Sequence, residues 1–266
     1  MRVPPITWLY VPADRPDRVE KAIASRAHAV IVDLEDAVAP AAKAEARANL
    51  SALLGSRAAK PVYVRVNAGS AEDLRALADL ELEGVLVPKV ARPEHAPALE
   101  LPVHCLIESA AGVEAAYAIA STPGVAGISL GEADLRSETG ALDAGLDWAR
   151  ARIVNAAVAA GLPRPPQSVY PRLRDPEGLA RSCRRGRELG HLGRTAIHPE
   201  QLEAIEAAYL PTAAELERAR ETVERLEADL GAGMSGGDFV DAAMLGGARQ
   251  IVALAAAYGT APAERI

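Results

Sequence analysis

Carboxylates stand directly after two of the short apolar runs in this sequence. Glu108 ends the run Val-His-Cys-Leu-Ile, and Asp134 comes shortly after the next run along the chain. A carboxylate that leaves a buried strand is costly unless it is paired, hydrogen-bonded or bound to a metal. Two neighbouring carboxylates without a thiolate or histidine cluster favour a hard octahedral cation. The pair is therefore a candidate Mg²⁺ site, and a salt bridge to Arg65 or Lys89 is the structural alternative.

Two cationic residues also end strand-like runs. Arg65, in Val-Tyr-Val-Arg-Val-Asn, carries a planar fork that suits a substrate carboxylate or a developing alkoxide, and a buried ion pair is the alternative. Lys89, in Val-Pro-Lys-Val, would form a Schiff base only if its pKa were lowered.

Further polar residues occupy corresponding places, and nearly every run delivers one. The two cysteines lack a nearby base, and four of the five histidines lack the spacing of metal ligands, so neither type is expected to do chemistry. The polar residues at the ends of runs are Asp14, Arg15, Asp33, Glu35, Asp36, Asn67, Ser109, Glu132 and His198.

The elements that must position these residues alternate between apolar runs and helix-like segments. Most runs are continuously apolar, as strands buried on both faces are, and such alternation is typical of parallel βα units. Eight units predict an α/β fold, a (β/α)₈ TIM barrel over residues 1–210, whose chemistry lies at the carboxyl ends of the strands. An open doubly wound sheet is the alternative, but no Gly-rich phosphate turn follows the first run. The runs are Ile6–Val11, Ala29–Leu34, Val62–Val66, Gly84–Val87, Val103–Ile107, Gly127–Leu130, Ser168–Tyr170 and Thr195–Ile197.

The pattern changes after the last run. Thr212–Leu230 predicts a charged amphipathic helix, residues 231–237 a Gly-rich linker, and Phe239–Tyr258 a second helix. We expect residues 211–266 to form a C-terminal helical extension that contacts a neighbouring subunit.

Composition excludes several classes of partner. A formal net charge of -7 without a basic run argues against nucleic acid and anionic membranes. No apolar stretch approaches the ~20 residues needed to span a bilayer, and the N-terminus lacks the apolar core of a signal peptide. The sequence indicates a cytoplasmic protein with no membrane partner.

Seven motifs occur in the order found in a known family, from about Leu9 to the C-terminal helix. Together they resemble the citrate lyase β-subunit-like family. The resemblance implies a barrel with a C-terminal extension, a Mg²⁺ cofactor, and retro-Claisen cleavage of a CoA thioester. The motifs are Tyr-Val-Pro-Ala-Asp-Arg-Pro-Asp-Arg, Val-Asp-Leu-Glu-Asp-Ala-Val, Val-Arg-Val-Asn, Val-Pro-Lys-Val, Leu-Ile-Glu-Ser-Ala-Ala-Gly, Leu-Gly-Glu-Ala-Asp-Leu and Ala-Ile-His-Pro-Glu-Gln.

The same resemblance implies roles for individual residues. It assigns the metal to Glu108 and Asp134, with Glu108 also contacting substrate, and it places Arg65 on the substrate carboxylate and oxyanion. Glu35 and Asp36 would lie beside the water molecules of the metal.

Asp241 matches the position from which relatives complete the site of a neighbouring subunit, and it is the implied proton carrier. A cap of the last helix is the alternative for this residue. Sharing of Asp241 implies a homotrimer or hexamer.

Three departures from the family pattern bear on the chemistry. Gly-Glu-Ala-Asp-Leu replaces Gly-Ala-Glu-Asp-Leu, so that the Glu beside Asp134 is displaced. Gln167 and Ser168 replace an acid, and Ala242-Ala243 replaces the Pro that usually follows the Asp of the extension. They leave the acyl substituent and the role of Asp241 open.

The sequence thus predicts a Mg²⁺-dependent lyase that cleaves or forms a β-hydroxyacyl-CoA, such as citramalyl-, malyl- or citryl-CoA, from an acyl-CoA and a keto acid. Three alternatives stay open: a thioesterase or synthase on the same barrel, a pyruvate-type aldolase that does not need CoA, and a non-catalytic acyl-CoA-binding subunit.

Overall fold

The structure is a computed structural model that describes residues 3–54, 59–228, 233–235, 238–240 and 242–261. The chain divides into two compact units. One comprises residues 5–205, and the other comprises residues 1–4 together with 206–266. The predicted boundary at residue 210 stays a prediction.

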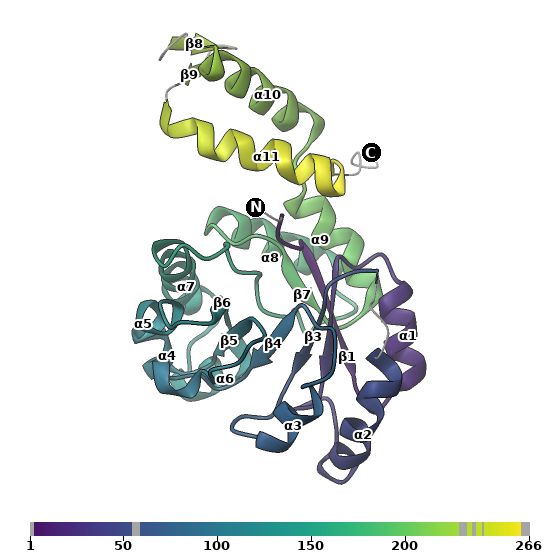
Figure 1. Cartoon of the computed structure of the whole chain (residues 1–266). Coiled ribbons are helices and arrows are strands. Elements are labelled where there is room, and N and C mark those ends of the chain that lie inside the picture. Colours follow the sequence, from purple (N-terminus) through teal and green to yellow (C-terminus); the bar gives the residue numbers. More distant parts are fainter. Residues whose placement is uncertain (1–2, 55–58, 229–232, 236–237, 241, 262–266) are drawn as a thin grey trace. The chain divides into compact units, whose positions relative to one another are not determined.

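The larger unit is an α/β fold built on one parallel sheet. The sheet has seven strands in the order β6-β5-β4-β3-β2-β1-β7, and every neighbouring pair is parallel (Figure 1). Seven of the eight apolar runs therefore form strands as predicted. The strands are β1 Thr7–Pro12, β2 Ala29–Asp33, β3 Val62–Arg65, β4 Gly84–Val87, β5 Val103–Ile107, β6 Val125–Leu130 and β7 Arg194–Ala196.

The predicted strand Ser168–Tyr170 is wrong. A single parallel bridge between Gln167 and Arg194 stands in its place, beside β7. Prolines at 163, 165, 166 and 171 surround this segment, and proline has no backbone N–H to give to a ladder. The sheet is accordingly a seven-stranded one.

Helices follow the strands and pack on the sheet. Helix α1 packs on β1, and α5 and α7 pack on β6. The predicted long helix after β6 is two helices, because Gly140 adopts a left-handed φ of 68° and ends α6. The helices are α1 Pro16–Ala24, α2 Lys43–Leu54, α3 Ala71–Ala76, α4 Ala110–Glu114, α5 Ala116–Ala120, α6 Glu132–Thr139, α7 Asp147–Ala159, α8 Pro176–Glu188 and α9 Leu202–Tyr209, the last of which crosses the boundary between the units.

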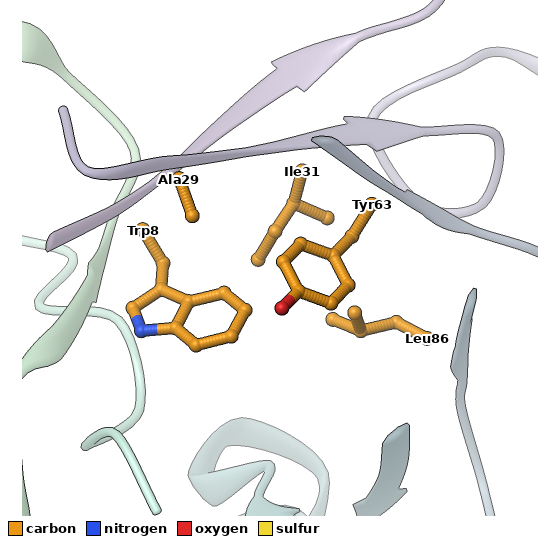
Figure 2. Close-up of a cluster of buried hydrophobic side chains, with 5 residues drawn as sticks. All are labelled: Trp8, Ala29, Ile31, Tyr63 and Leu86. Carbon is orange, nitrogen blue, oxygen red and sulfur yellow. The ribbon is translucent and has the colours of Figure 1, made fainter. Parts of the chain in front are cut away.

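Large apolar side chains fill the space near the amino ends of the strands. Trp8, Ala29, Ile31, Tyr63 and Leu86, from four adjacent strands, form one buried cluster (Figure 2). The rings of Trp8 and Tyr63 lie 4.8 Å apart between centroids. Since these side chains occupy the amino-terminal half of the interior, the carboxyl ends of the strands are left for polar groups.

The smaller unit contains two long helices that pack on one another, α10 Ala213–Glu227 and α11 Leu245–Tyr258. Thr212 and Glu215 form a capping box at the start of α10. The prediction of a helix from Phe239 is wrong at its beginning. Strands β8 Gly233–Ser235 and β9 Asp238–Val240 pair antiparallel there, because Phe and Val beside a Gly-Gly pair favour a hairpin.

In the part of the chain that the structure describes, no helix is both long and apolar enough to cross a membrane.

Candidate functional site

A cavity of about 350 Å³ opens at the carboxyl ends of the strands of the larger unit. Its walls come from six strands and from the segment that replaces the predicted Ser168–Tyr170 strand. We predicted six site residues, of which the structure describes five. Four of these five line the cavity, and the fifth, Glu35, contacts Arg65 and Lys89 instead. The lining residues are Tyr10, Asp33, Asp36, Ala37, Arg65, Leu106, Glu108, Ser129, Leu130, Gly131, Glu132, Ala133, Asp134, Gln167, Ser168, Val169, Thr195 and Ile197.

A fork-to-fork ion pair fixes Arg65. The register of β2 and β3 places Asp33 directly opposite Arg65. The Nε and Nη2 atoms of Arg65 donate to the two carboxylate oxygens of Asp33, each at 2.6 Å. Backbone N–H groups of Glu35 and Ala37 also donate to Asp33, at 3.0 Å each, so the acid is held in turn. Asp33 had no predicted role, because the partner across a ladder depends on a register that one sequence does not show.

The free edge of the guanidinium meets two more acids. Nη1 of Arg65 lies 2.9 Å from Glu35 and 3.6 Å from Asp36, and its Cζ lies 5.1 Å from the ring centre of Tyr10. Although burial lowers it, bonding to Asp33 raises the pKa of Arg65 above its ordinary value, so the side chain stays charged. We call Arg65, Asp33, Glu35 and Asp36 the Arg65 group.

Lys89 borders this group. Its Nζ lies 3.3 Å from a carboxylate oxygen of Glu35. Glu35 raises the pKa of Lys89, whereas a Schiff base at neutral pH needs a lowered one. The raised pKa favours the charged ammonium form of Lys89 and argues against the Schiff-base alternative. Burial, followed by Asp36, raises the pKa of Glu35 even though Arg65 opposes that shift.

Glu108 lies close to other carboxylates. It accepts a hydrogen bond of 2.9 Å from the backbone N–H of Lys89. It packs so tightly on Gly131 that a Cβ there would lie 2.5 Å from a carboxylate oxygen, so this position requires glycine. Burial raises the pKa of Glu108 to about 7, and Glu35 and Asp134 add to the rise. A cation bound beside Glu108 would favour the ionised form of this carboxyl.

Asp134 stands in the first turn of α6 and is exposed to the same cavity as Glu108. Two carboxylates that line one cavity, with open space for water or substrate oxygens, fit a hard cation. Among the described residues, no group of three or more His, Cys, Asp or Glu could hold a metal ion. Protein atoms would thus supply two ligands, and Mg²⁺ takes most of its shell from water and substrate.

A second buried arginine lies behind α6. Arg150 of α7 is 4% exposed, and its Nη2 and Nε bind the carboxylate of Glu132 at 2.6 and 2.9 Å. It also contacts Asp143 at 2.8 Å and Asp147 at 2.9 Å. We call these four residues the Arg150 group. The displaced Glu of the Gly-Glu-Ala-Asp-Leu motif, which also lines the cavity, is thus paired with an arginine of α7.

The residues that replace the expected acid near the seventh strand are structural. Gln167 is buried; it accepts from Arg194 at 3.1 Å and donates to the Ser182 carbonyl at 3.1 Å. Ser168 accepts a bond of 3.3 Å from the backbone N–H of Glu132 and so supports the start of α6.

Several other candidates do not join the site. His198 caps the turn at Glu200, and Asn67 bonds Asp73 at 2.7 Å. Burial raises the pKa of Cys105 to about 12, in agreement with the prediction that it is no nucleophile. Asp241 lies outside the described residues.

Comparison with known proteins agrees with the resemblance drawn from the motifs. Residues 7–103 and 97–199 match the model of the HpcH/HpaI aldolase/citrate lyase family. This chain belongs to that family. A (3S)-malyl-CoA thioesterase of Cereibacter sphaeroides is 36% identical to it over 241 residues, which cover 82% of each protein. An L-malyl-CoA/β-methylmalyl-CoA lyase of the same species is 30% identical over 83% of each.

Solved structures agree with the fold. CitE from Mycobacterium tuberculosis, in complex with magnesium, acetoacetate and coenzyme A, superposes with a TM-score of 0.81 and is 32% identical. The match covers 96% of this chain and all of that one. Magnesium is thus present in a structural relative of this chain.

Proposed function

We propose that this protein is a Mg²⁺-dependent lyase that cleaves, or forms by condensation, the carbon–carbon bond of a β-hydroxyacyl-CoA. The products of cleavage are an acyl-CoA and a keto acid. One observation carries the proposal: a guanidinium fixed by Asp33 and the two carboxylates of Glu108 and Asp134 line the same cavity. Relatives that act on malyl-CoA and bind coenzyme A support the class of substrate.

Glu108 and Asp134 are the proposed metal ligands, and Glu35 and Asp36 are the proposed acceptors for the water molecules of the metal. Asp36 lines the same cavity, and both acids contact Arg65. Bound Mg²⁺ would lower the pKa of the substrate hydroxyl and stabilise the negative charge that develops when the carbon–carbon bond breaks.

Arg65 is the proposed binding group for the carboxylate of the keto-acid half. Asp33 orients it through two bonds of 2.6 Å, so little reorganisation is needed when substrate charge arrives. Its remaining edge, which faces Glu35 and Asp36, borders the cavity. A guanidinium there would stabilise charge on the carbonyl fragment during cleavage.

Asp241 is the proposed proton carrier for the α-carbon of the acyl-CoA, supplied by a neighbouring subunit of a homotrimer or hexamer. We further infer that the larger unit is a (β/α)₈ barrel, with the Gln167 bridge as the remainder of its seventh strand, followed by the extension of residues 211–266.

The test incubates the protein with malyl-, citramalyl- and citryl-CoA, with and without Mg²⁺, and measures keto acid and free thiol separately. A lyase releases keto acid without free thiol, and only when Mg²⁺ is present. Glu108→Gln and Asp134→Asn should each abolish this dependence together with activity. Activity that survives both substitutions would reject the metal assignment.

A thioesterase is the second candidate, because a (3S)-malyl-CoA thioesterase is 36% identical to this chain. It would release free CoA thiol and a β-hydroxy acid, with no keto acid. Turnover of free hydroxy-keto acids without CoA would point to an aldolase. Binding of the CoA esters without turnover would point to a non-catalytic subunit.

A further inference from the structure

The hydrogen bonds from the chain to β5 lose their regular spacing just past the end of β4, which itself pairs regularly with β5 from Val85 to Val87. The N–H of Val85 donates to the Pro102 carbonyl at 2.9 Å, and the N–H of Val90 donates to the Leu106 carbonyl at 3.1 Å. Between these two bonds the chain advances five residues on the β4 side, from Val85 to Val90, but only four on the β5 side, from Pro102 to Leu106. One extra residue on one strand is a β-bulge, a feature common beside active sites.

The ladder between β2 and β3 shows what a regular pairing would give. The N–H of Val30 donates to the Pro61 carbonyl and that of Leu34 to the Arg65 carbonyl, which is four steps on each side. By the same rule the N–H of Lys89, and not that of Val90, would bind Leu106. The bulge therefore releases the N–H of Lys89 from the ladder.

Lys89 adopts the backbone conformation that this release requires. Its φ is 58°, and it is the one non-glycine with positive φ among the residues that the structure describes. In an extended strand successive N–H groups point to opposite sides, whereas here those of Lys89 and Val90 both face β5 and its end. The left-handed conformation is unfavourable for a residue with a Cβ, so neighbouring contacts must hold it.

The released N–H has one acceptor, a carboxylate oxygen of Glu108 at 2.9 Å. At the other end of the residue, the ammonium lies 3.3 Å from Glu35, which itself contacts Arg65. Lys89 therefore joins the two parts of the site, one through its backbone and the other through its side chain.

We propose that Lys89 is a positioning residue, whose bulged left-handed backbone aims an N–H at Glu108 while its contact with Glu35 holds that strained conformation. The inference rests on the proposed function, in which Glu108 binds Mg²⁺. It predicts that the backbone conformation at this position, apart from the positive charge, sets the affinity for the metal.

Lys89→Gly and Lys89→Ala separate the two contributions. Both remove the ammonium and its contact with Glu35. Gly adopts a positive φ without strain, so its N–H stays on Glu108, whereas Ala must relax toward negative φ and turn the N–H away. Isothermal titration of the metal-free full-length proteins with MgCl₂ should show binding roughly tenfold weaker for Lys89→Ala than for Lys89→Gly, the lower end of what loss of a metal ligand's hydrogen-bond partner costs.

A matched control places the same strain elsewhere. Gly161 has a φ of 75° with open space around its Cβ position, so Gly161→Ala should weaken stability and leave the Mg²⁺ affinity unchanged. If Lys89→Ala does not fold, Lys89→Ser against Lys89→Asn repeats the contrast, because Asn tolerates positive φ better than Ser.

The outcomes are distinguishable. Equal Mg²⁺ affinities for the Gly and Ala variants, with binding intact in the unmodified protein, would overturn the role of Lys89 and leave the proposed lyase standing. Absence of Mg²⁺ binding by the unmodified protein would overturn the metal site and this inference with it.

Discussion

The Arg65 group and the Arg150 group each place one largely buried arginine among three carboxylates, but the pKa of Glu35 in the first group shifts in the opposite direction to those of Asp143 and Asp147 in the second. In the Arg150 group, hydrogen bonds from Arg150 lower the pKa of Asp143, and bonds from Arg185 and Arg150 outweigh burial and lower that of Asp147. In the Arg65 group, burial raises the pKa of Glu35. The same residue types thus stabilise the ionised form of two acids in the Arg150 group, and they disfavour the ionised form of Glu35 in the Arg65 group.

The surroundings of each arginine explain the difference. Arg136 and Arg185 contact the Arg150 group, so three arginines serve its three acids. Around the cavity, Arg65 and Lys89 are paired with acids of the Arg65 group, and Glu108 and Asp134 line the same cavity. Glu132 lines it too, but this acid is paired with Arg150. The paired acids of the Arg150 group serve structure, and the carboxylates of Glu108 and Asp134 are suited to a cation.

The largest effect is expected at the Arg150 group. Arg150→Leu removes the closest partner of Glu132, whose side chain is largely buried, and leaves it only the longer contact with Arg136. Breaking a buried pair costs about 3–5 kcal/mol. Urea denaturation should show this loss in the free energy of unfolding. Arg152→Leu, on the same helix, is the control, with an expected loss below about 1 kcal/mol. Equal losses for the two variants would mean that the Arg150 group is not structural.

Arg65→Lys should lower activity much more than stability, which is the opposite of what we expect for Arg150→Leu. Lysine keeps the charge beside Asp33 and loses the planar fork that orients it. We expect kcat to fall by about 10²–10³, comparable with removal of a preorganised oxyanion donor, and unfolding to change much less. Steady-state kinetics with the best CoA ester checks this. A variant that loses stability but keeps its kcat would place Arg65 with Arg150 as a structural residue.

Mg²⁺ should stabilise the protein through Glu108 and Asp134 selectively. At a concentration of 100 times its Kd, a ligand that binds only the folded state adds about 2.7 kcal/mol. Thermal denaturation with and without MgCl₂ should show this shift for the unmodified protein and lose it in Glu108→Gln. Asp147→Asn, which removes one charge from the Arg150 group, should keep the shift. Loss of the shift in both variants would argue for a non-specific effect of charge.

The effect that is smallest at neutral pH concerns the histidine near the Arg150 group. Burial lowers the pKa of His191 to about 4, so the unfolded chain binds this proton more readily than the folded one. Stability is therefore complete above about pH 6.5 and falls as the pH drops toward 4, by up to about 1.4 kcal/mol per pH unit. His191→Phe should flatten this slope in urea titrations. Burial of His28 and His104 contributes in the same window, so part of the slope should remain.

Much of the fold could be read from the apolar runs. Seven of them became strands with nearly the predicted bounds, because strands buried on both faces must be continuously apolar. The weak run Ser168–Tyr170 did not form a strand, because flanking prolines leave few N–H groups for a ladder, and a single bridge at Gln167 stands there. In the extension, the start of the last helix was misplaced, because Phe239 and Val240 fit a helix pattern as well as a strand.

The candidate site was partly visible for a related reason. Residues that end parallel strands share one edge, so the sequence brought Arg65, Glu108 and Asp134 to one cavity without knowledge of any distance. The sequence also allowed two alternatives, a salt bridge for Glu108 and Asp134 and a Schiff base at Lys89. The lysine alternative depended on a pKa, which only the positions of Glu35 and Asp36 decide.

The amino-acid sequence by itself determined which residues end the strands, and therefore which side chains meet at the cavity, because this follows from the order and length of the apolar runs. Tertiary structure decided how those side chains are paired. Strand register pairs Arg65 with Asp33, and helix packing pairs Glu132 with Arg150. A bulge directs the N–H of Lys89 to the carboxylate of Glu108. Pairing depends on offsets of one residue between distant segments, and local pattern does not encode such offsets.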